Sequence, residues 1–312
     1  MGPMLELAFA TPRKLPRAAE TRGRVVVLDL AFASEASGSG FDKITKPFID
    51  GLGARLARWV DHHDHNRHVD YANDPRFVLS TKQEHGACPE MVTETLVADT
   101  GVVDTIVCHT DFDGLASAAK WMRGGREPYP GADDDARAID TRIGKPSKIG
   151  ERFDRALRAS PRDTALFGII VRHLETGLGD ASLWTPIDDA GHKLIAIEET
   201  TRALTHHYSV LDVKPSPESS ATRVAFVDAS SAHGKYDRTM LLLAGQERAN
   251  VAVCVDGENL SLAAPFDSGM NFLTLLGLSG GMPTLVSVNR SRLGEVLEKL
   301  GVSASDRTRL IG

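Results

Sequence analysis

The sequence predicts an α/β protein in which a parallel-sheet domain is followed by a smaller α/β domain. Apolar runs rich in β-branched residues recur at 24–29, 56–60 and 102–108, and helical patterns stand between and after them. Runs this apolar are typical of strands buried on both faces of a sheet, and alternation of strands with helices is typical of a parallel sheet. Each run also ends at acidic or histidine side chains. Since open parallel sheets place ligands at the carboxyl ends of their strands, the pattern predicts a site as well as a fold.

Length and composition limit the functions that the chain can have. Its 312 residues, 42% of them hydrophobic, suffice for one large or two ordinary globular domains. The net charge of −6 argues against a protein that coats long nucleic acids, because such a surface must be basic. No run approaches the roughly 18 apolar residues of a membrane span, and residues 1–22 lack the apolar core of a secretory signal. The three cysteines are widely spaced, which predicts neither a disulfide framework nor a zinc ribbon and fits a reducing cytoplasm.

The first domain, at 1–213, is expected to alternate strands with helices. In chain order we expect a strand at 24–29, a loop at 34–40, a helix at 42–53, a strand at 56–60, a loop-rich stretch at 67–83, a helix at 89–99, a strand at 102–108, a helix at 115–122, a loop at 126–135 and mostly helical sequence to 207. Pro47 marks a start or a kink of its helix, and Gly101 ends the next one. The Pro- and Ser-rich segment 214–221 is the expected linker.

The second domain, at 222–312, is expected to be a small α/β domain. Its elements are a strand at 223–228, a helix at 236–245, strands at 250–255 and 259–263, a Gly-rich turn at 277–282, a strand at 285–288 and a helix at 290–300. Asp256-Gly257 is a strong hairpin signal between the second and third of these strands.

Carboxylates and imidazoles cluster at the ends of the three strands predicted in the first domain. Asp29 ends the first strand, the run 61–65 (Asp-His-His-Asp-His) ends the second, and His109, Asp111 and Asp113 follow the third. If the strands are parallel, these groups meet at one edge, where clustered carboxylates repel one another unless cations separate them. Mixed carboxylate and imidazole ligands suit Mn²⁺, while an all-oxygen cage would suit Mg²⁺ or Ca²⁺ better. Two ions ~3.5–4 Å apart would activate a water and clamp phosphate oxygens.

Other interpretations of these motifs stay open from the residues alone. The run 61–65 could be a solvated turn, and Asp113 could be the acidic start of a helix, favoured by the helix dipole. The alternate spacing of His109, Asp111 and Asp113 favours ligands that point into one volume, with Gly114 allowing a sharp turn into the helix. The helix role and the ligand role are compatible with each other.

The same residues resemble a known family, the DHH phosphoesterase superfamily. Val60-Asp61-His62-His63 resembles its signature, residues 109–117 (HTDFDGLAS) are similar to its motif I, and Asp29 resembles its motif II aspartate. The family includes single-strand exonucleases, oligoribonucleases, cyclic-dinucleotide phosphodiesterases and family II inorganic pyrophosphatases. The resemblance covers most of residues 24–142 and implies two bound Mn²⁺ ions, with Mg²⁺ or Co²⁺ as substitutes.

The resemblance implies a role for each matching residue. It implies that His109 and Asp111 bind one ion, that His62, Asp113 and Asp140 bind the other, that Asp29 bridges the two, that His63 faces the scissile phosphate, and that Asp61 orients a histidine. Arg142, close behind Asp140, is a candidate phosphate contact.

The chain departs from the family pattern in two respects. The motifs at Asp29 and Asp61 precede the motif at 109–113, so the catalytic domain resembles a circular permutation of the family's domain. Residues 222–312 resemble the family's smaller substrate-binding domain of the DHHA1 type. Gly280 and Gly281 keep its glycine turn, which implies a substrate contact, but the histidine that usually follows is missing.

The segment Ser261-Leu262-Ala263 also lacks the arginine usual in that smaller domain. Arg290 and Arg292 are either its substitutes or ordinary exposed residues of the last helix. Near the first motif, His65 and His68 are interpreted as loop residues rather than ligands. His85 and Cys88 lack the second pair of ligands that zinc needs, and the acidic run 133–135 is interpreted as a solvated loop.

The sequence therefore predicts a Mn²⁺-dependent phosphoesterase that hydrolyses a phosphodiester of a nucleotide or short oligonucleotide. A hydrolase of pyrophosphate or another small phosphate compound is the alternative enzyme. A non-catalytic metal or nucleotide sensor on the same scaffold is the alternative from another class. We expect a cytoplasmic protein without membrane or long nucleic-acid partners, and a homodimer is one expected assembly.

Overall fold

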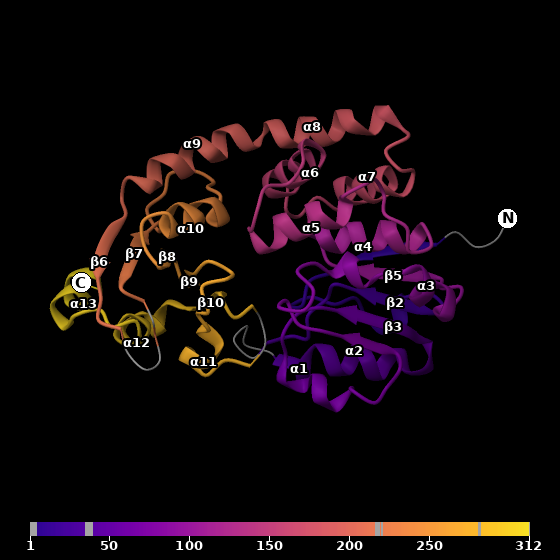
Figure 1. Cartoon of the computed structure of the whole chain (residues 1–312), viewed down its shortest axis with the longest axis horizontal. Coiled ribbons are helices and arrows are strands. Elements are labelled where there is room, and N and C mark those ends of the chain that lie inside the picture. The colour runs from indigo at the N-terminus through magenta and orange to yellow at the C-terminus, as the bar shows by residue number, and fades with distance from the viewer. Residues whose placement is uncertain (1–4, 35–39, 216–218, 220, 280–281, 312) are drawn as a thin grey trace. The chain divides into compact units, whose positions relative to one another are not determined.

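The computed structural model describes residues 5–34, 40–215, 219, 221–279 and 282–311. Its contacts divide the chain into two compact units, Met1–Leu194 and Ile195–Gly312 (Figure 1). The segment 214–221, predicted as a linker, is thus part of the second unit and is only partly described. The predicted domain bounds of 1–213 and 222–312 stay a prediction. Within the described ranges, no helix combines the length and apolar character that crossing a membrane requires.

The first unit contains a parallel sheet, which confirms the predicted α/β fold class. Its five strands, in spatial order, are β1 (Glu6–Phe9), β5 (Thr105–Cys108), β2 (Val25–Leu28), β3 (Leu56–Asp61) and β4 (Phe77–Leu79). All four neighbouring pairs are parallel. The three predicted strands are the central ones, and the two edge strands were not predicted.

The order of the strands reverses between β2 and β5. From β2 the chain adds β3 and β4 towards one edge, and it then returns to place β5 on the other side of β2. This is the kind of switch point at which open parallel sheets bind ligands. Because β2 pairs with both β3 and β5, the carboxyl ends of these three strands lie side by side, as the sequence predicted.

Two hydrophobic cores cover the two faces of this sheet. Val25 and Val27 of β2 face a core with the helix α2 (Thr45–Leu52), whereas Val26 and Leu28 face a core with α4 (Phe112–Met122). Figure 1 shows α2 and α4 on opposite sides of the strands. The first unit also contains α1 (Gly40–Lys43), α3 (Glu94–Thr100), α5 (Ala132–Thr141), α6 (Lys148–Ala159), α7 (Thr164–Glu175) and α8 (Trp184–His192).

Three predicted elements of the first unit were wrong. The helix predicted at 42–53 is divided into α1 and α2, with Ile44 between them. Residues 89–99 do not form one helix but a 3-10 turn, Cys88–Met91, followed by α3. Thr93 separates them, because its side chain accepts a hydrogen bond from the backbone N–H of Leu96 and so begins a new helix.

The acidic run 133–135, predicted as part of a solvated loop, opens α5 instead. Asp135 is buried and accepts a hydrogen bond of 2.7 Å from the hydroxyl of Tyr129. The predicted loop at 34–40 falls mostly outside the described residues.

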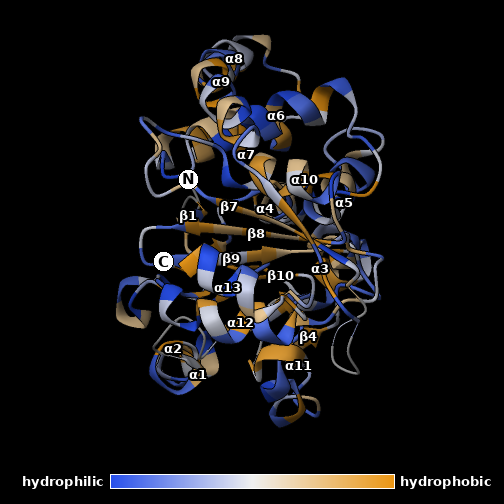
Figure 2. Cartoon of the chain, turned by 90° about the vertical axis from the view of Figure 1, so that its left-hand side faces the viewer, coloured by the Kyte–Doolittle hydropathy of each residue, from blue (hydrophilic) through white to orange (hydrophobic). Residues whose placement is uncertain are grey.

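The second unit contains a mixed sheet of five strands. Their spatial order is β10 (Leu285–Asn289), β9 (Asn259–Ala263), β8 (Val251–Asp256), β7 (Arg223–Asp228) and β6 (Ser209–Asp212), and only β7 and β8 are parallel. Figure 2 shows the hydrophobic colouring of its inner strands. The helices of this unit are α9 (Leu194–Thr205, which begins at the unit boundary), α10 (Arg238–Gln246), α11 (Phe272–Leu276), α12 (Leu293–Lys299) and α13 (Ala304–Ile311). The predicted hairpin at Asp256-Gly257 is confirmed, while β6, α11 and α13 were not predicted.

Candidate metal centre

Three adjacent strand ends bring most of the candidate ligands of the first unit together. Asp29 directly follows β2, while β3 ends at Asp61 and leads into His62 and His63. His109 directly follows β5. The parallel pairing of β2 with β3 and β5 therefore delivers these side chains to one edge of the sheet.

Asp29 lies at the centre of this cluster. Its Oδ1 is 3.2 Å from Nε2 of His62 and 3.8 Å from Nδ1 of His63. Its Oδ2 is 3.4 Å from Nδ1 of His109. The side chain is completely buried, yet neither oxygen has a hydrogen-bond partner with good geometry among the described groups. A buried carboxylate left in this state is costly, and a cation between these groups would remove the cost.

The backbone of Asp29 is also unusual. Its φ of 57° lies in the left-handed region, which side-chain-bearing residues seldom adopt, although aspartate and asparagine tolerate it better than most. Such strained residues gather at functional sites. The conformation turns the chain out of β2 at the point where the carboxylate meets the three histidines.

An outer group of donors consists of Asp29, His109 and Asp111, whose ligand atoms lie within 4.8 Å of one another. Nδ1 of His109 is 2.7 Å from Oδ2 of Asp111. The other carboxylate oxygen of Asp111 accepts a 3.4 Å hydrogen bond from the N–H of Gly114 and caps α4. The helix cap is therefore Asp111 and not Asp113, which lies inside the first turn. His109 and Asp111 are partly exposed, so this group is open to solvent.

An inner group consists of His62, Asp113 and Asp140, again with ligand atoms within 4.8 Å of one another. Nε2 of His62 is 3.3 Å from Oδ2 of Asp113, and Nδ1 of His62 is 2.8 Å from the carbonyl oxygen of His85. Because a carbonyl only accepts, Nδ1 of His62 carries a proton and donates it to His85. Carbonyl partners of this kind orient metal-binding histidines and leave Nε2 directed at the ion.

Lys82 is the residue of this cluster that the sequence did not predict. Its side chain is 2% exposed, and its Nζ forms an ion pair with Asp140. Lys82 lies in the loop after β4, the edge strand that was also not predicted. The signal was present in the sequence, since the short apolar run at Phe77–Leu79 places the next polar residues at the same edge of the sheet.

Asp61 holds His63. Its Oδ1 is 2.8 Å from Nδ1 of His63, the contact made by a carboxylate that orients an imidazole. A further group of donors, Asp29, His62 and His63, also lies within 4.8 Å. His63 could therefore serve either as a ligand or as a group that meets the substrate, and its bond to Asp61 suits both.

The electrostatics of the cluster favour bound cations. Burial opposes a proton on His62, but the carboxylates of Asp113 and Asp29 outweigh it and raise its pKa to about 11. Burial likewise opposes a proton on His109, and the carboxylates of Asp111 and Asp29 raise its pKa well above the usual value. Without metal, the carboxylates thus hold protons on two histidines. His63 differs, because burial and the charges of Lys82 and His62 lower its pKa to about 3.

Gly114 serves a purpose other than the predicted sharp turn. It lies in the first turn of α4, and its φ is not in the left-handed region. A Cβ at this position would lie 2.7 Å from both the Cβ and the carbonyl oxygen of His109. Glycine is therefore required by the close approach of α4 to the end of β5.

Some candidate residues do not join the cluster. Arg142 lies 3.4 Å from Asp154 through its Nη1 and is in none of the donor groups. Gly280 and Gly281 lie outside the described residues. In the second unit, Arg290 pairs with Asp228 and Arg292 pairs with Glu295.

The neighbours of the motif also have specific places. His65 and His68 pack against the ring of Phe32, with centroids 5.6 Å and 5.0 Å away. His85 contributes its carbonyl oxygen, and Cys88 donates a 3.4 Å hydrogen bond from its N–H to Asp113. Both act through the backbone, where no side-chain pattern could reveal them.

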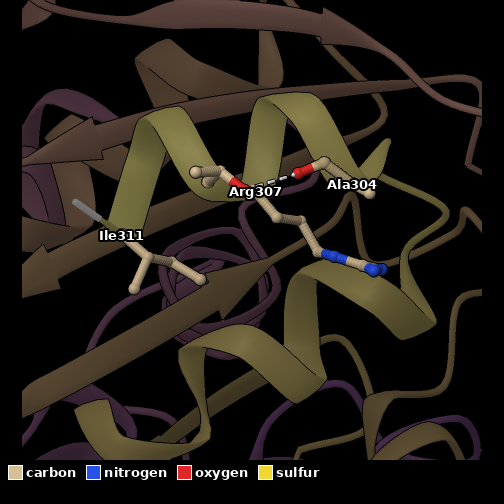
Figure 3. A pocket seen from close by; sticks show the side chains of 4 residues that line it. Ala304, Arg307 and Ile311 are labelled. Atoms are coloured by element: carbon tan, nitrogen blue, oxygen red, sulfur yellow. Dashed lines mark hydrogen bonds between the residues drawn. The ribbon is translucent and has the colours of Figure 1, made fainter.

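A hollow along α13 is unrelated to these ligands. Ala304, Arg307, Thr308 and Ile311 line it, all from one helix of the second unit (Figure 3). None of them is a carboxylate or a histidine, so the hollow has no metal-binding character.

The outer group fits a divalent cation. It offers two carboxylates and an imidazole, and three of its buried atoms, both oxygens of Asp29 and Nδ1 of His109, lack a hydrogen-bond partner in the described part of the chain. The inner group does not fit a second cation as it stands, because Lys82 already neutralises Asp140. Comparison of the chain with protein-family models gives no match, and comparison with curated proteins gives none either.

Proposed function

We propose that the chain is a Mn²⁺-dependent phosphoester hydrolase related to the DHH phosphoesterases, with permuted motifs. The observation that carries the proposal is Asp29, a fully buried carboxylate whose oxygens have no hydrogen-bond partner among the described residues and which is surrounded by His62, His63 and His109. Residues of three separate strand ends contribute to this arrangement, and its donors are of the kind that Mn²⁺ prefers. Mg²⁺ and Co²⁺ are the expected substitutes.

Asp29, His109 and Asp111 would hold the metal in this proposal. A bound divalent cation would supply Lewis-acid chemistry at a phosphate oxygen. Asp61 orients the ring of His63 through Nδ1, and the low pKa of His63 keeps this ring neutral, so that Nε2 can accept a hydrogen bond from a water or from a protonated group of the substrate. The carbonyl of His85 fixes the ring of His62 in the same way.

The proposed substrate is a nucleotide phosphodiester or a short oligonucleotide. A net charge of −6 disfavours long polynucleotides, which are held mainly by basic surfaces. In the second unit, the proposed DHHA1-like substrate domain, Arg290 is paired with Asp228, so its charge is partly neutralised. A panel of cyclic dinucleotides, short oligonucleotides and pyrophosphate would select among the substrate classes. Binding without turnover across the panel would favour a sensor instead.

The proposal is tested with Asp29→Asn, assayed on bis-p-nitrophenyl phosphate with Mn²⁺. Loss of a direct ligand should lower the rate by more than the roughly 10- to 100-fold typical of groups that only support a ligand. Asp104→Asn is the matched control, since Asp104 precedes β5 at the opposite edge of the sheet and accepts a hydrogen bond from the backbone of Arg24. Unchanged hydrolysis by Asp29→Asn would contradict the proposed function.

A further inference from the structure

We infer that the ammonium group of Lys82 takes the place of a second metal ion, so that the centre holds one divalent cation and not two. The inference rests on the proposed function, because it concerns the same centre. Lys82 is nearly as buried as Asp29, and its Nζ pairs with Asp140 in the inner group of donors. The inner group thus already contains a cation that belongs to the chain.

The loop that carries Lys82 is tied to the centre on both sides. The N–H of Ser80 donates a 2.9 Å hydrogen bond to the carbonyl of Asp61, and the carbonyl of His85 accepts from His62. Between these anchors, the N–H of His85 bonds to the carbonyl of Thr81 at 3.0 Å and closes a tight turn around Lys82. Lys82 is therefore held in the cluster by its backbone and is not a surface side chain folded inward.

Burial makes the pair of Lys82 and Asp140 difficult to open. An ammonium group taken out of water needs a partner, and among the described residues Asp140 is the one that forms an ion pair with Lys82. A divalent ion on Asp140 would bring a second positive charge to the same carboxylate. At a buried position, solvent and salt screen the repulsion between the two cations only weakly.

The outer group differs in this respect. Among the described residues, only histidines form ion pairs with Asp29 and Asp111, and no lysine or arginine does. Asp111 and His109 are also partly exposed, which gives an ion a way in. Each of the two donor groups therefore has one cation: a metal ion in the outer group and the ammonium group of Lys82 in the inner group.

The experiment counts Mn²⁺ ions in the full chain. Metal-free wild type and Lys82→Met are titrated with Mn²⁺ by calorimetry, and the loaded proteins are examined by electron paramagnetic resonance, which separates an isolated ion from a coupled pair. Lys120→Met is the matched control, because Lys120 is also buried and pairs with Asp133 at 2.5 Å, away from the donor groups. We expect one isolated ion in wild type and in Lys120→Met, and a coupled pair of ions in Lys82→Met.

Each outcome decides the inference. Two ions in wild type, or one ion in a folded Lys82→Met, would overturn it and leave the proposed function standing. No binding by wild type would overturn both. If Lys82→Met does not fold, Lys82→Gln removes the positive charge and keeps a polar group beside Asp140. One ion in wild type and two in that variant would then support the inference, and two ions in wild type or one in the folded variant would overturn it.

Discussion

At the scale of single residues, Asp29 combines two features that lower the stability of a folded chain. Its backbone is left-handed, which costs of order 1 kcal/mol or more, and its buried carboxylate has no hydrogen-bond partner of good geometry in the described part of the chain. Neither feature helps the metal-free chain to fold. Both are explained if the residue is placed for an ion that the carboxylate must reach.

We expect metal-free Asp29→Asn to melt at the same temperature as wild type or higher. Asparagine tolerates the left-handed region at least as well as aspartate, and the substitution removes a fully buried carboxylate whose oxygens have no hydrogen-bond partner of good geometry among the described groups. Thermal unfolding in the presence of a chelator measures this. A clear drop in the melting temperature would mean that Asp29 is held by protein contacts, and would remove the reason for placing a cation beside it.

A second prediction at this scale concerns His173 and the dependence of stability on pH. It is fully buried in α7, neither ring nitrogen has a hydrogen-bond partner among the described groups, and its ring packs 4.5 Å from that of Trp184. Burial lowers its pKa below the ordinary 6.5, opposed by the charge of Asp180 and reinforced by that of Arg152. The unfolded chain therefore takes up this proton at a higher pH than the folded chain does.

The contribution of His173 to stability is complete above about pH 6.5 and is lost as the pH falls through the folded pKa. Position 173 cannot titrate in His173→Phe. We therefore expect the melting temperature of this variant to fall less than that of wild type when the pH is lowered from about 7.5 to about 5.5. His206→Gln is the control, because His206 is exposed. An equal loss in wild type and His173→Phe would contradict the prediction.

At the scale of elements, Asp111 at the start of α4 is a helix cap and, in our proposal, also a metal ligand. One carboxylate oxygen of Asp111 accepts a hydrogen bond from the N–H of Gly114, and the other forms an ion pair with His109. Asparagine caps helices about as well as aspartate but lacks the ligand charge. We expect Asp111→Asn to change stability by less than about 0.5 kcal/mol and to weaken Mn²⁺ binding by at least about 10-fold.

Thr93→Ala provides the matched comparison for that prediction. Thr93 caps α3 through the N–H of Leu96, and its loss should cost about 1 kcal/mol without changing Mn²⁺ affinity. Denaturant unfolding and metal titration together separate the two roles. If Asp111→Asn lost stability and kept its affinity, the cap would be the whole role of Asp111.

The sequence predicted those elements whose burial leaves a continuous signal. β2 and β5 are buried at every position and β3 at nearly every one, so each appears as a mostly apolar run. β1 and β4 are short, partly exposed edge strands, and apolar runs as short as theirs are difficult to separate from loop sequence. Missing β4 had a consequence for the site, because the loop that follows it supplies Lys82 and the carbonyl of His85.

The candidate site was predictable only as far as side chains at strand ends reveal it. Asp29, His62 and His109 were found because each directly follows an apolar run or lies one residue beyond its end. The pairing of Lys82 with Asp140 joins residues 58 positions apart, which no local pattern encodes. The reason for Gly114 was also hidden, because its contact is with His109 across a turn.

At the scale of the whole molecule, every candidate ligand belongs to the first compact unit. Asp29, the earliest, and Asp140, the latest, both lie within Met1–Leu194. Binding to the folded state alone stabilises by about 2.7 kcal/mol when the ligand is at 100 times its dissociation constant. For a unit of this size, that corresponds to a rise of roughly 5–10 °C in melting temperature.

We therefore expect Mn²⁺ to stabilise the first unit selectively. Hydrogen exchange followed by mass spectrometry should slow in peptides that contain β3 and α4, and remain unchanged in peptides that contain β8 of the second unit. Asp29→Asn should show neither the slower exchange nor the rise in melting temperature, which controls for weak binding of Mn²⁺ to surface carboxylates. Equal protection of β8 and α4 in wild type would show that the metal acts on the whole chain, and the assignment of its ligands to the first unit alone would then be wrong.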